Sequence, residues 1–262
     1  MTDYIKNYYD NYDEDNRLAS RHGQVEYITT MRYIEKYLFN GAKVLEIGAG
    51  TGRYSHAIAQ KGYAVDAVEL VPHNIEIFRS KITPDEVITV TQGDARDLSA
   101  FTDESYDITL LLGPLYHMFT IEDKRQTIDE ALRVTKPGGV VFAAYCMSDA
   151  SIMEGGFKNN RFDMVDFINK GLINAETFET RSAPELVFEI VRKEQIDEVM
   201  EAFDVERLHF VATDLYTHHM RESINAMGEE SFALYLRYHF AICERPDMIG
   251  LTHHSLDIFK KA

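Results

Sequence analysis

Cysteine is nearly absent from this sequence of 262 residues, which holds only Cys146 and Cys243. The two lie far apart and no CxxC spacing occurs, so the sequence predicts neither a disulfide framework nor a zinc site. A chain with so little cysteine fits a reducing cytoplasm.

Basic residues are also in deficit, because 27 Lys and Arg stand against 43 Asp and Glu and give a formal net charge of −16. Nucleic acids and anionic lipid surfaces are bound by clustered Lys and Arg, and the sequence has no such cluster. The charge therefore argues against nucleic acid as a partner.

Long apolar runs are missing as well. No stretch approaches the roughly 18 apolar residues that a membrane-spanning helix needs. The N-terminal segment MTDYIKNYYDNYDEDNR is polar, aromatic and acidic, unlike a secretory signal. We expect a soluble, cytoplasmic protein without a membrane partner.

The residues that are present alternate between strand and helix patterns. Apolar residues recur at helical spacing in 24–39, and short apolar runs suit buried strands. The strands are expected at 44–47, 63–70, 87–93, 106–112 and 140–146, with helices near 52–61, 73–81 and 121–135 and a turn at 136–139. This alternation predicts a parallel α/β sheet covered by helices on both faces.

The pattern changes after Cys146. Residues 148–178 read as a helical insertion, LVFEIV as an added strand, 193–203 as a helix and 218–243 as a second helical stretch. Further core strands are expected at 206–213 and 254–262. We therefore interpret 1–262 as one domain, with N-terminal lid helices in 1–40, a ligand-binding core in 41–147, and a cap insertion plus the last two core strands in 148–262.

A glycine-rich turn, KVLEIGAGTGRYS, follows the first strand. It does not match GxGxxG, because Arg53 stands where a dinucleotide site needs glycine, and no P-loop string GxxxxGK[ST] is present near it. An acid, Glu46, precedes the glycines. It would repel a pyrophosphate but suits a ligand that carries an ammonium group and a sulfonium centre.

Two more acids end the following strands. Glu69 closes the second strand, where its carboxylate is placed to accept hydrogen bonds from ribose hydroxyls. Asp94 follows the third strand and is placed to accept from an adenine amino group, with the Ala95 N–H beside it.

With these motifs the sequence resembles the class I S-adenosylmethionine-dependent methyltransferases over roughly Lys43 to Tyr145. VLEIGAGTG resembles their first motif, GDARDL their adenine-binding segment and LRVTKPGGVVFAAY the turn and fifth strand that follow. The resemblance implies S-adenosylmethionine as cofactor and a Rossmann-like, doubly wound, seven-stranded sheet with the last strand antiparallel. The cofactor residues it implies in this stretch are Glu46, Gly48, Ala49, Gly50, Gly52, Glu69, Leu70, Asp94, Ala95 and Leu112.

The acceptor is expected near GPLYH, which follows the fourth strand and resembles a string in small-molecule members of the family. His117 would be a general base and Tyr116 would orient the acceptor. In the alternative, Tyr116 packs on the cofactor and His117 caps the next helix.

Residues outside the core complete the predicted site. In related enzymes an N-terminal helix with tyrosines folds over the cofactor, so Tyr12 and Arg21 are assigned to the cofactor and His22 to the acceptor. Late in the chain, Tyr216, His218 and Arg221 are assigned to an acceptor pocket in the cap. No metal is expected, because no HExxH or HxxxH spacing occurs and two adjacent histidines of a regular helix or strand cannot both face one ion.

The sequence thus predicts methyl transfer from S-adenosylmethionine to a nitrogen or oxygen of a small molecule, by in-line displacement with an optional His or Tyr base. The alternatives are a non-catalytic module that binds S-adenosylmethionine and a methyltransferase acting on a protein or tRNA. A monomer or a homodimer is expected.

Overall fold

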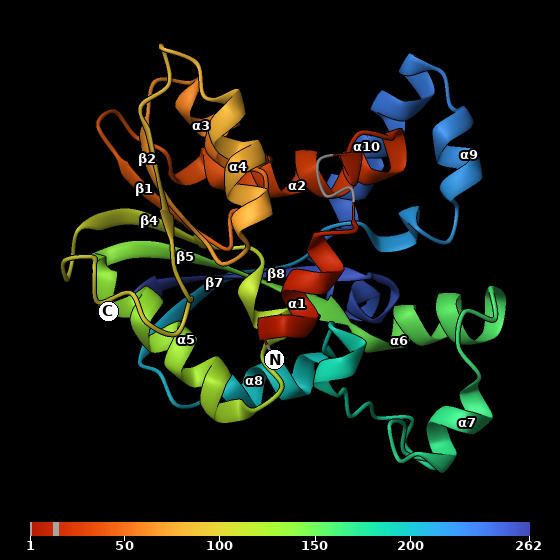
Figure 1. The fold of residues 1–262 in the computed structure, drawn as a ribbon. Helices are drawn as coiled ribbons and strands as arrows, with labels where there is room; N and C mark the ends of the chain where they lie inside the picture. The colour runs from red at the N-terminus through yellow and green to blue at the C-terminus, as the bar shows by residue number, and fades with distance from the viewer. Residues whose placement is uncertain (1, 13–15) are drawn as a thin grey trace.

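The computed structural model describes residues 2–12 and 16–262, and its centre is one twisted sheet (Figure 1). Seven strands follow the order β3-β2-β1-β4-β5-β8-β7, and β6 pairs with β5 off this path. The strands are β1 (Lys43–Ile47), β2 (Ala64–Glu69), β3 (Ile88–Gln92), β4 (Tyr106–Leu111), β5 (Thr135–Met147), β6 (Ile190–Val191), β7 (Val205–Ala212) and β8 (His254–Lys261). The last strand, β8, is antiparallel to both β5 and β7, as predicted.

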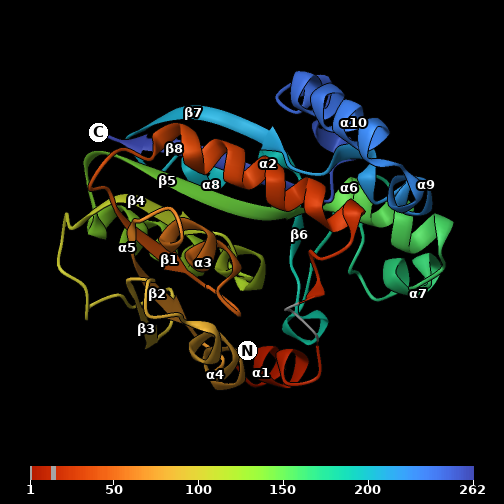
Figure 2. The ribbon, with the colours of Figure 1, turned by 90° about the horizontal axis from the view of Figure 1, so that it is seen from above.

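Helices cover both faces of the sheet. Seen from above, α2 and α3 lie in front of the sheet, and α5 and α8 lie behind it (Figure 2). The helices of the core are α2 (Arg21–Tyr37), α3 (Arg53–Ala59), α4 (Pro72–Lys81), α5 (Ile121–Val134) and α8 (Lys193–Met200). No helix in the described ranges is long and apolar enough to cross a membrane.

Strand β1 lies in the middle of the sheet, and its burial explains its composition. Val44, Leu45 and Ile47 are fully buried although their side chains alternate between the two faces. Because both faces are covered, the strand reads as a continuous apolar run rather than an alternating one. The exception is Glu46, which is also buried and lines a cavity at the end of the strand.

The predicted turn at 136–139 is instead part of strand β5. Tyr106 pairs with Thr135 and Ile108 pairs with Val140, so the extra residues of β5 loop out as an irregularity between these pairs. Gly138 permits this with a φ of 76°. The glycine-rich segment therefore bends a strand rather than separating a helix from it.

The cap consists of two insertions rather than one. The first leaves the sheet after β5 and contains α6 (Ser148–Ser151), η3 (Ile152–Lys158), α7 (Met164–Asn169) and η4 (Pro184–Leu186) before it returns through β6. The second lies between β7 and β8 and contains η5 (Leu215–Thr217), α9 (Arg221–Ala226), α10 (Glu229–Ile242) and η6 (Pro246–Leu251). Helix α8 and strand β7, which separate the two insertions, belong to the core.

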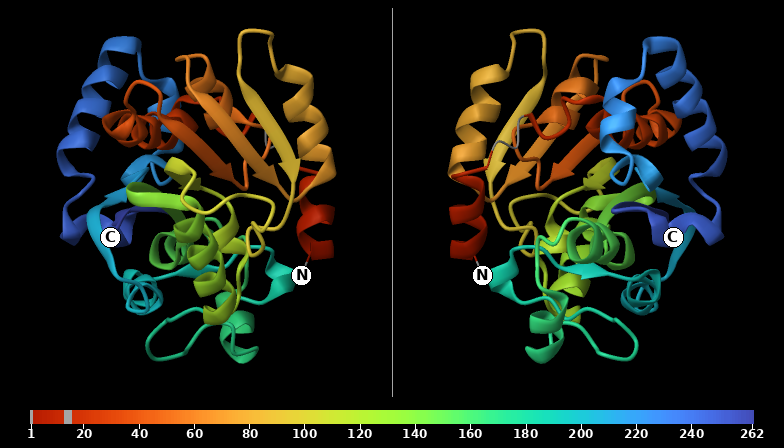
Figure 3. Two further views of the ribbon diagram at one scale, coloured as in Figure 1. Left: turned by 90° about the vertical axis from the view of Figure 1, so that its left-hand side faces the viewer. Right: turned by 90° about the vertical axis from the view of Figure 1, so that its right-hand side faces the viewer.

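The second insertion folds back onto α2. Thr29 Oγ1 lies 2.9 Å from His239 Nε2 on α10, and both residues are buried. Nearby, the Tyr33 hydroxyl donates to Glu244 at 2.5 Å. Figure 3 shows α10 beside α2, while the N-terminal helix α1 (Thr2–Tyr9) lies beside α4 at the opposite side of the molecule.

Gly52 holds the start of α3 against α4, which predicts a stability effect. Its φ is 85°, and an added Cβ would lie 2.3 Å from the ring of Phe78. Gly52→Ala should lower the free energy of unfolding by about 2–4 kcal/mol, from the left-handed backbone and from overpacking. Urea unfolding measures this.

Gly62→Ala is the matched control. Gly62 has a φ of 91° but nothing within 4 Å of an added Cβ, so only the backbone cost of about 1 kcal/mol should appear. Equal losses of unfolding free energy in the two variants would mean that the contact with Phe78 does not contribute to stability.

Candidate active site

Two neighbouring cavities open at the carboxyl ends of β1, β2, β3 and β4, and both are lined by Gly48, Gly50 and Tyr116. The first cavity is also lined by Ile5, Tyr9, Val68, Glu69, Leu70, Val71, Asn74, Gly93, Asp94, Ala95, Arg96, Gly113, Pro114, His117 and Met118. The second is also lined by Arg17, Leu18, Glu46, Ala49, Thr51, Arg53, Tyr54 and Leu112. A long ligand that crosses the glycine turn would occupy both.

The glycine turn is shaped by close backbone approach. Gly48 has a φ of 74°, and an added Cβ would lie 2.6 Å from Pro114 at the start of η2 (Pro114–His117). Its N–H donates to Val68 O at 2.8 Å, which ties the turn to β2. Any side chain at this position would separate the turn from η2. Gly52 lines neither cavity, and its contact with Phe78 gives it a packing role.

Glu69 links the turn to the next helix. Its carboxylate accepts from Gly50 N at 2.8 Å and Val71 N at 2.9 Å, and from Asn74 Nδ2 at 3.3 Å. Burial raises the pKa of Glu69, and these hydrogen bonds oppose the rise. The buried carboxylate is therefore held in place by backbone amides on the wall of the first cavity.

Asp94 reaches the first cavity together with Arg96. The Arg96 guanidinium donates to both carboxylate oxygens of Asp94, at 3.1 and 2.7 Å, and to Asp123 at 3.0 Å. This pairing lowers the pKa of Asp94, so the group is ionised at neutral pH. The sequence analysis did not assign Arg96, although its position two residues after the acid is a usable signal.

Glu46 lines the second cavity. It is 1% exposed and accepts from Ser55 N at 2.9 Å and from Ser55 Oγ. Burial raises the pKa of Glu46 to about 7, so its charge changes near neutral pH. A cation bound in this cavity would favour the ionised carboxylate.

The N-terminal helix α1 covers the first cavity through Ile5 and Tyr9. Tyr12, which the sequence assigns to the cofactor, is 38% exposed and stacks on Tyr8 with ring centroids 5.0 Å apart. It lines neither cavity. Tyr12 follows the end of α1, and the helix meets the site through Tyr9, three residues earlier.

His117 joins three segments of the chain. Its Nδ1 lies 2.8 Å from the Val187 carbonyl, which can only accept, so Nδ1 carries the proton and Nε2 accepts from the Tyr9 hydroxyl at 3.1 Å. Burial lowers the pKa of His117 to about 4, so the ring is neutral. Both nitrogens are engaged, so a base at this position would first have to release Tyr9.

Tyr116 lies at the junction of the two cavities, and its hydroxyl donates to Leu112 O at 3.2 Å. Its ring also lies near Phe188 from the cap, with centroids 5.9 Å apart. The residue is therefore placed to contact a ligand that passes from one cavity to the other.

Arg17, rather than Arg21, supplies the guanidinium of the second cavity. Arg17 lines that cavity and pairs with Glu26 through contacts of 2.9 and 3.1 Å. Arg21 instead donates to the Met227 carbonyl and lies over the ring of Phe232. Arg17 precedes α2 and Arg21 is its first residue, and of the two only Arg17 lines the cavity.

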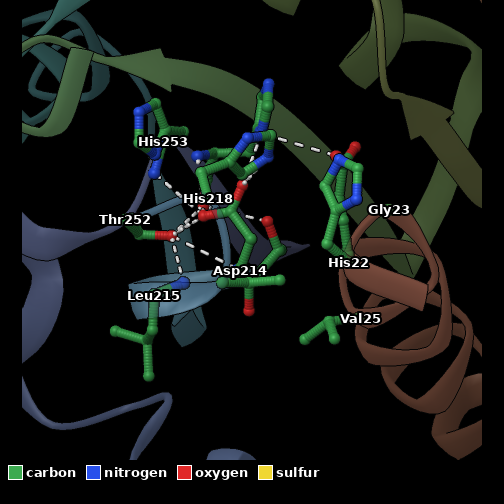
Figure 4. A network of polar contacts seen from close by, with 12 residues as sticks. His22, Gly23, Val25, Asp214, Leu215, His218, Thr252 and His253 are labelled. Atoms are coloured by element: carbon green, nitrogen blue, oxygen red, sulfur yellow. Dashed lines mark hydrogen bonds and ion pairs between the residues drawn. The ribbon is translucent and has the colours of Figure 1, made fainter. Parts of the chain in front are cut away.

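Three of the residues that the sequence assigns to an acceptor pocket in the cap or at the start of α2 form a separate polar cluster. His22 from α2 lies 5.6 Å from the ring of His218, and His218 lies 3.1 Å from Arg221 between nitrogen atoms. Figure 4 shows Asp214 in the middle of this network. Tyr216 is partly buried against the core. None of these four assigned residues lines either cavity.

The comparisons with known proteins agree with this geometry. Residues 45–143 match the family described as "Methyltransferase domain". The chain is 30% identical over 149 residues to a demethylmenaquinone methyltransferase of Clavibacter sepedonicus, covering 56% of this chain and 58% of that protein. It is 27% identical over 163 residues to a glycine/sarcosine N-methyltransferase of Aphanothece halophytica, covering 61% and 59%.

The matched region thus spans less than two thirds of either relative. A solved structure of an S-adenosylmethionine-dependent methyltransferase from Methanosarcina mazei has the same fold, with a TM-score of 0.59 and 18% identity over 87% of this chain and 96% of that one. The domain match, the fold and the acids around the glycine turn agree. Together they support a class I S-adenosylmethionine-dependent methyltransferase domain in this chain, matched over residues 45–143.

Proposed function

We propose that this protein transfers the methyl group of S-adenosylmethionine to a nitrogen or oxygen atom of a small molecule. The observation that carries the proposal is the placement of two buried acids, Glu46 and Glu69, on either side of one glycine turn, each on the wall of its own cavity. This charge pattern suits a cationic, ribose-bearing ligand and disfavours a pyrophosphate.

The two cavities would hold different parts of the cofactor. In the first, Glu69 would accept from the ribose hydroxyls, and Asp94 with Ala95 would meet the adenine. In the second, Glu46 would face the ammonium group and Arg17 the carboxylate. Gly48, without a side chain, lets the ligand cross between them. The buried acids fit this ligand because each would gain a partner for its charge.

A small acceptor is supported by the covering of the site. Helix α1 lies over the first cavity, and the cap segment at Val187 and Phe188 contacts Tyr116 and His117. Such a covered site favours a small molecule over a folded macromolecule. The names of the two relatives point the same way, since one names demethylmenaquinone and the other glycine and sarcosine.

When bound, S-adenosylmethionine would supply a methyl group on a sulfonium: the acceptor lone pair would form the new bond to carbon as the carbon–sulfur bond broke and left its electron pair on sulfur. The protein then contributes alignment and exclusion of water. Tyr116 would orient the acceptor. We assign His117 to positioning α1 over the cavity rather than to proton removal, because its basic nitrogen already accepts from Tyr9. The acceptor proton would leave to water.

The activity test uses labelled S-adenosylmethionine and the low-molecular-mass fraction of a cell extract. A labelled small-molecule product is expected from the full chain. Glu69→Ala should bind the cofactor about 1–3 kcal/mol more weakly, or about 5- to 150-fold, because charge-assisted hydrogen bonds are lost. Calorimetry measures the affinity.

Glu76→Ala, at an exposed position of α4, is the matched control and should behave as the parent protein. Tight cofactor binding without any labelled product would instead support a non-catalytic binding module. Label on protein or tRNA, and not on a small molecule, would contradict the proposed acceptor class.

Glu46 predicts a pH dependence of cofactor binding. With its pKa raised to about 7 by burial, Glu46 is largely protonated below pH 7 in the free protein, and a bound ammonium favours its ionised form. Affinity should therefore rise about tenfold between pH 6 and pH 8, with a proton released on binding. Titration calorimetry in buffers of different ionisation enthalpy measures both effects.

Glu46→Gln tests the assignment, since it keeps the size of the side chain but cannot ionise. Its affinity for the cofactor should be lower, and the slope between pH 6 and 8 should flatten. An unchanged slope would assign the proton to another group, such as the likewise buried Glu69.

The hydrogen bond between Tyr9 and His117 predicts a role in holding the lid. Tyr9→Phe removes only the hydroxyl and should weaken cofactor binding about 3- to 20-fold through loss of one hydrogen bond. His117→Ala also removes the hydrogen bond to the Val187 carbonyl, so it should weaken binding more than Tyr9→Phe does. The double variant should lose little more than His117→Ala alone, because the hydrogen bond between the two residues is already gone. A fall in turnover for His117→Ala alone, at unchanged affinity, would instead identify His117 as the base.

A further inference from the structure

A second group of ionisable side chains lies outside the two cavities, where the cap meets α2 and the start of β8. Two sets of its donor atoms lie within 4.8 Å of one another: Glu26, Asp214, His218 and His254 form one set, and Glu154, His218 and His253 form the other. The second set joins η3, the segment after η5 and the residue before β8.

The first set is already satisfied by the protein. His254 Nδ1 lies 2.6 Å from Asp214 Oδ2, and Asp214 Oδ1 accepts from Thr252 Oγ1 at 2.5 Å and from His253 N at 2.8 Å. Glu26 is held by both terminal nitrogens of Arg17. The charges of this first set are therefore paired within the protein, and no ion is needed to balance them.

The second set contains ring nitrogens that make no hydrogen bond within the described residues. Both ring nitrogens of His253 are buried and make no hydrogen bond among the described residues. Nε2 nevertheless lies 2.8 Å from Glu154 Oε2, in an orientation that is not a hydrogen bond. A buried imidazole nitrogen 2.8 Å from a buried carboxylate oxygen, with no hydrogen bond between them, is an arrangement that a shared cation would complete.

The surroundings orient these donors as metal ligands usually are oriented. His218 Nε2 lies 3.3 Å from Asp214 Oδ2, which leaves Nδ1 as the atom that would bind a metal ion. Asn159 Nδ2 donates a hydrogen bond to Glu154 Oε1 at 3.3 Å. A carboxylate behind a ligating histidine and a hydrogen bond to a ligating carboxylate are common second contacts of metal sites.

Arg221 lies beside this position. Its Nη2 is 3.1 Å from His218 Nδ1 and 3.7 Å from Glu154 Oε1, so its guanidinium stands where a cation is favoured. The side chain is 37% exposed at the start of the short helix α9. It can swing outward and give up these two contacts when an ion binds.

We propose that Glu154, His218 and His253 bind one divalent transition-metal ion, with Zn²⁺ as the best match to two imidazoles and a carboxylate. The ion ties both insertions of the cap to the start of β8. Each pair of adjacent histidines contributes only one ligand, His218 from the first and His253 from the second. Two adjacent histidines therefore never share the ion at this site.

The test is titration calorimetry of the full chain, freed of metal, with Zn²⁺ alone. One ion per chain is expected, with a Kd in the micromolar range or below and a rise in the melting temperature, because the ion binds the folded state. Glu154→Gln and His253→Ala should each weaken binding ten- to a hundredfold or more. His73→Ala, at an exposed position of α4, is the matched control and should bind as the parent protein does.

Arg221→Met provides the opposite change. Because it removes a competing cation and no ligand, it should bind Zn²⁺ more tightly than the parent protein, and it keeps the test decisive if a ligand variant fails to fold. Circular dichroism checks the fold of each variant. No saturable binding, an affinity that Glu154→Gln and His253→Ala leave unchanged, an equal loss in His73→Ala, or a weaker Arg221→Met would each overturn the site.

Discussion

The site depends on one buried carboxylate that is held by backbone amides. Glu69 accepts from Gly50 in the turn after β1 and from Val71 at the start of α4, so a single side chain fixes two loops of neighbouring strands relative to each other. Removing a carboxylate from water is costly unless its oxygens are hydrogen-bonded. The two loops supply those bonds, and as a result the wall of the first cavity is formed before any ligand arrives.

The same constraint explains why the glycines and acids occur together. Gly48 must approach Pro114 closely, and the two cavities that share this turn are bordered by carboxylates instead of phosphate-binding groups. Glu46 and Glu69 lie close enough for the charge of Glu69 to oppose ionisation of Glu46. A cation between them relieves that repulsion. A ligand with a positive charge, as proposed for this site, would therefore offset the cost of burying these two acids.

Local patterns predicted the core well. The order of strands and helices, the antiparallel last strand and the position of Glu69, Asp94 and Ala95 beside one cavity follow from a strict alternation of elements, since strand ends in a parallel sheet meet at one edge. The residues that reach the site from outside this alternation were harder to place. Tyr9 and Arg17 face the cavities where Tyr12 and Arg21 were expected, because sequence spacing does not fix where α1 ends and α2 begins relative to the site. The cap histidines were misplaced for a similar reason: their neighbours come from η3 and from residues just before β8, which no local pattern connects.

The position of β8 also bears on how the chain reaches this structure. It is the last strand in chain order, yet it lies inside the sheet between β5 and β7. During synthesis, β5 keeps an unpaired edge until residues 254–261 have left the ribosome. The contact between Thr29 and His239, 210 residues apart, likewise closes late. A nascent chain stalled before β8 would carry an exposed strand edge over a nearly complete core, which makes this intermediate the natural client of a chaperone.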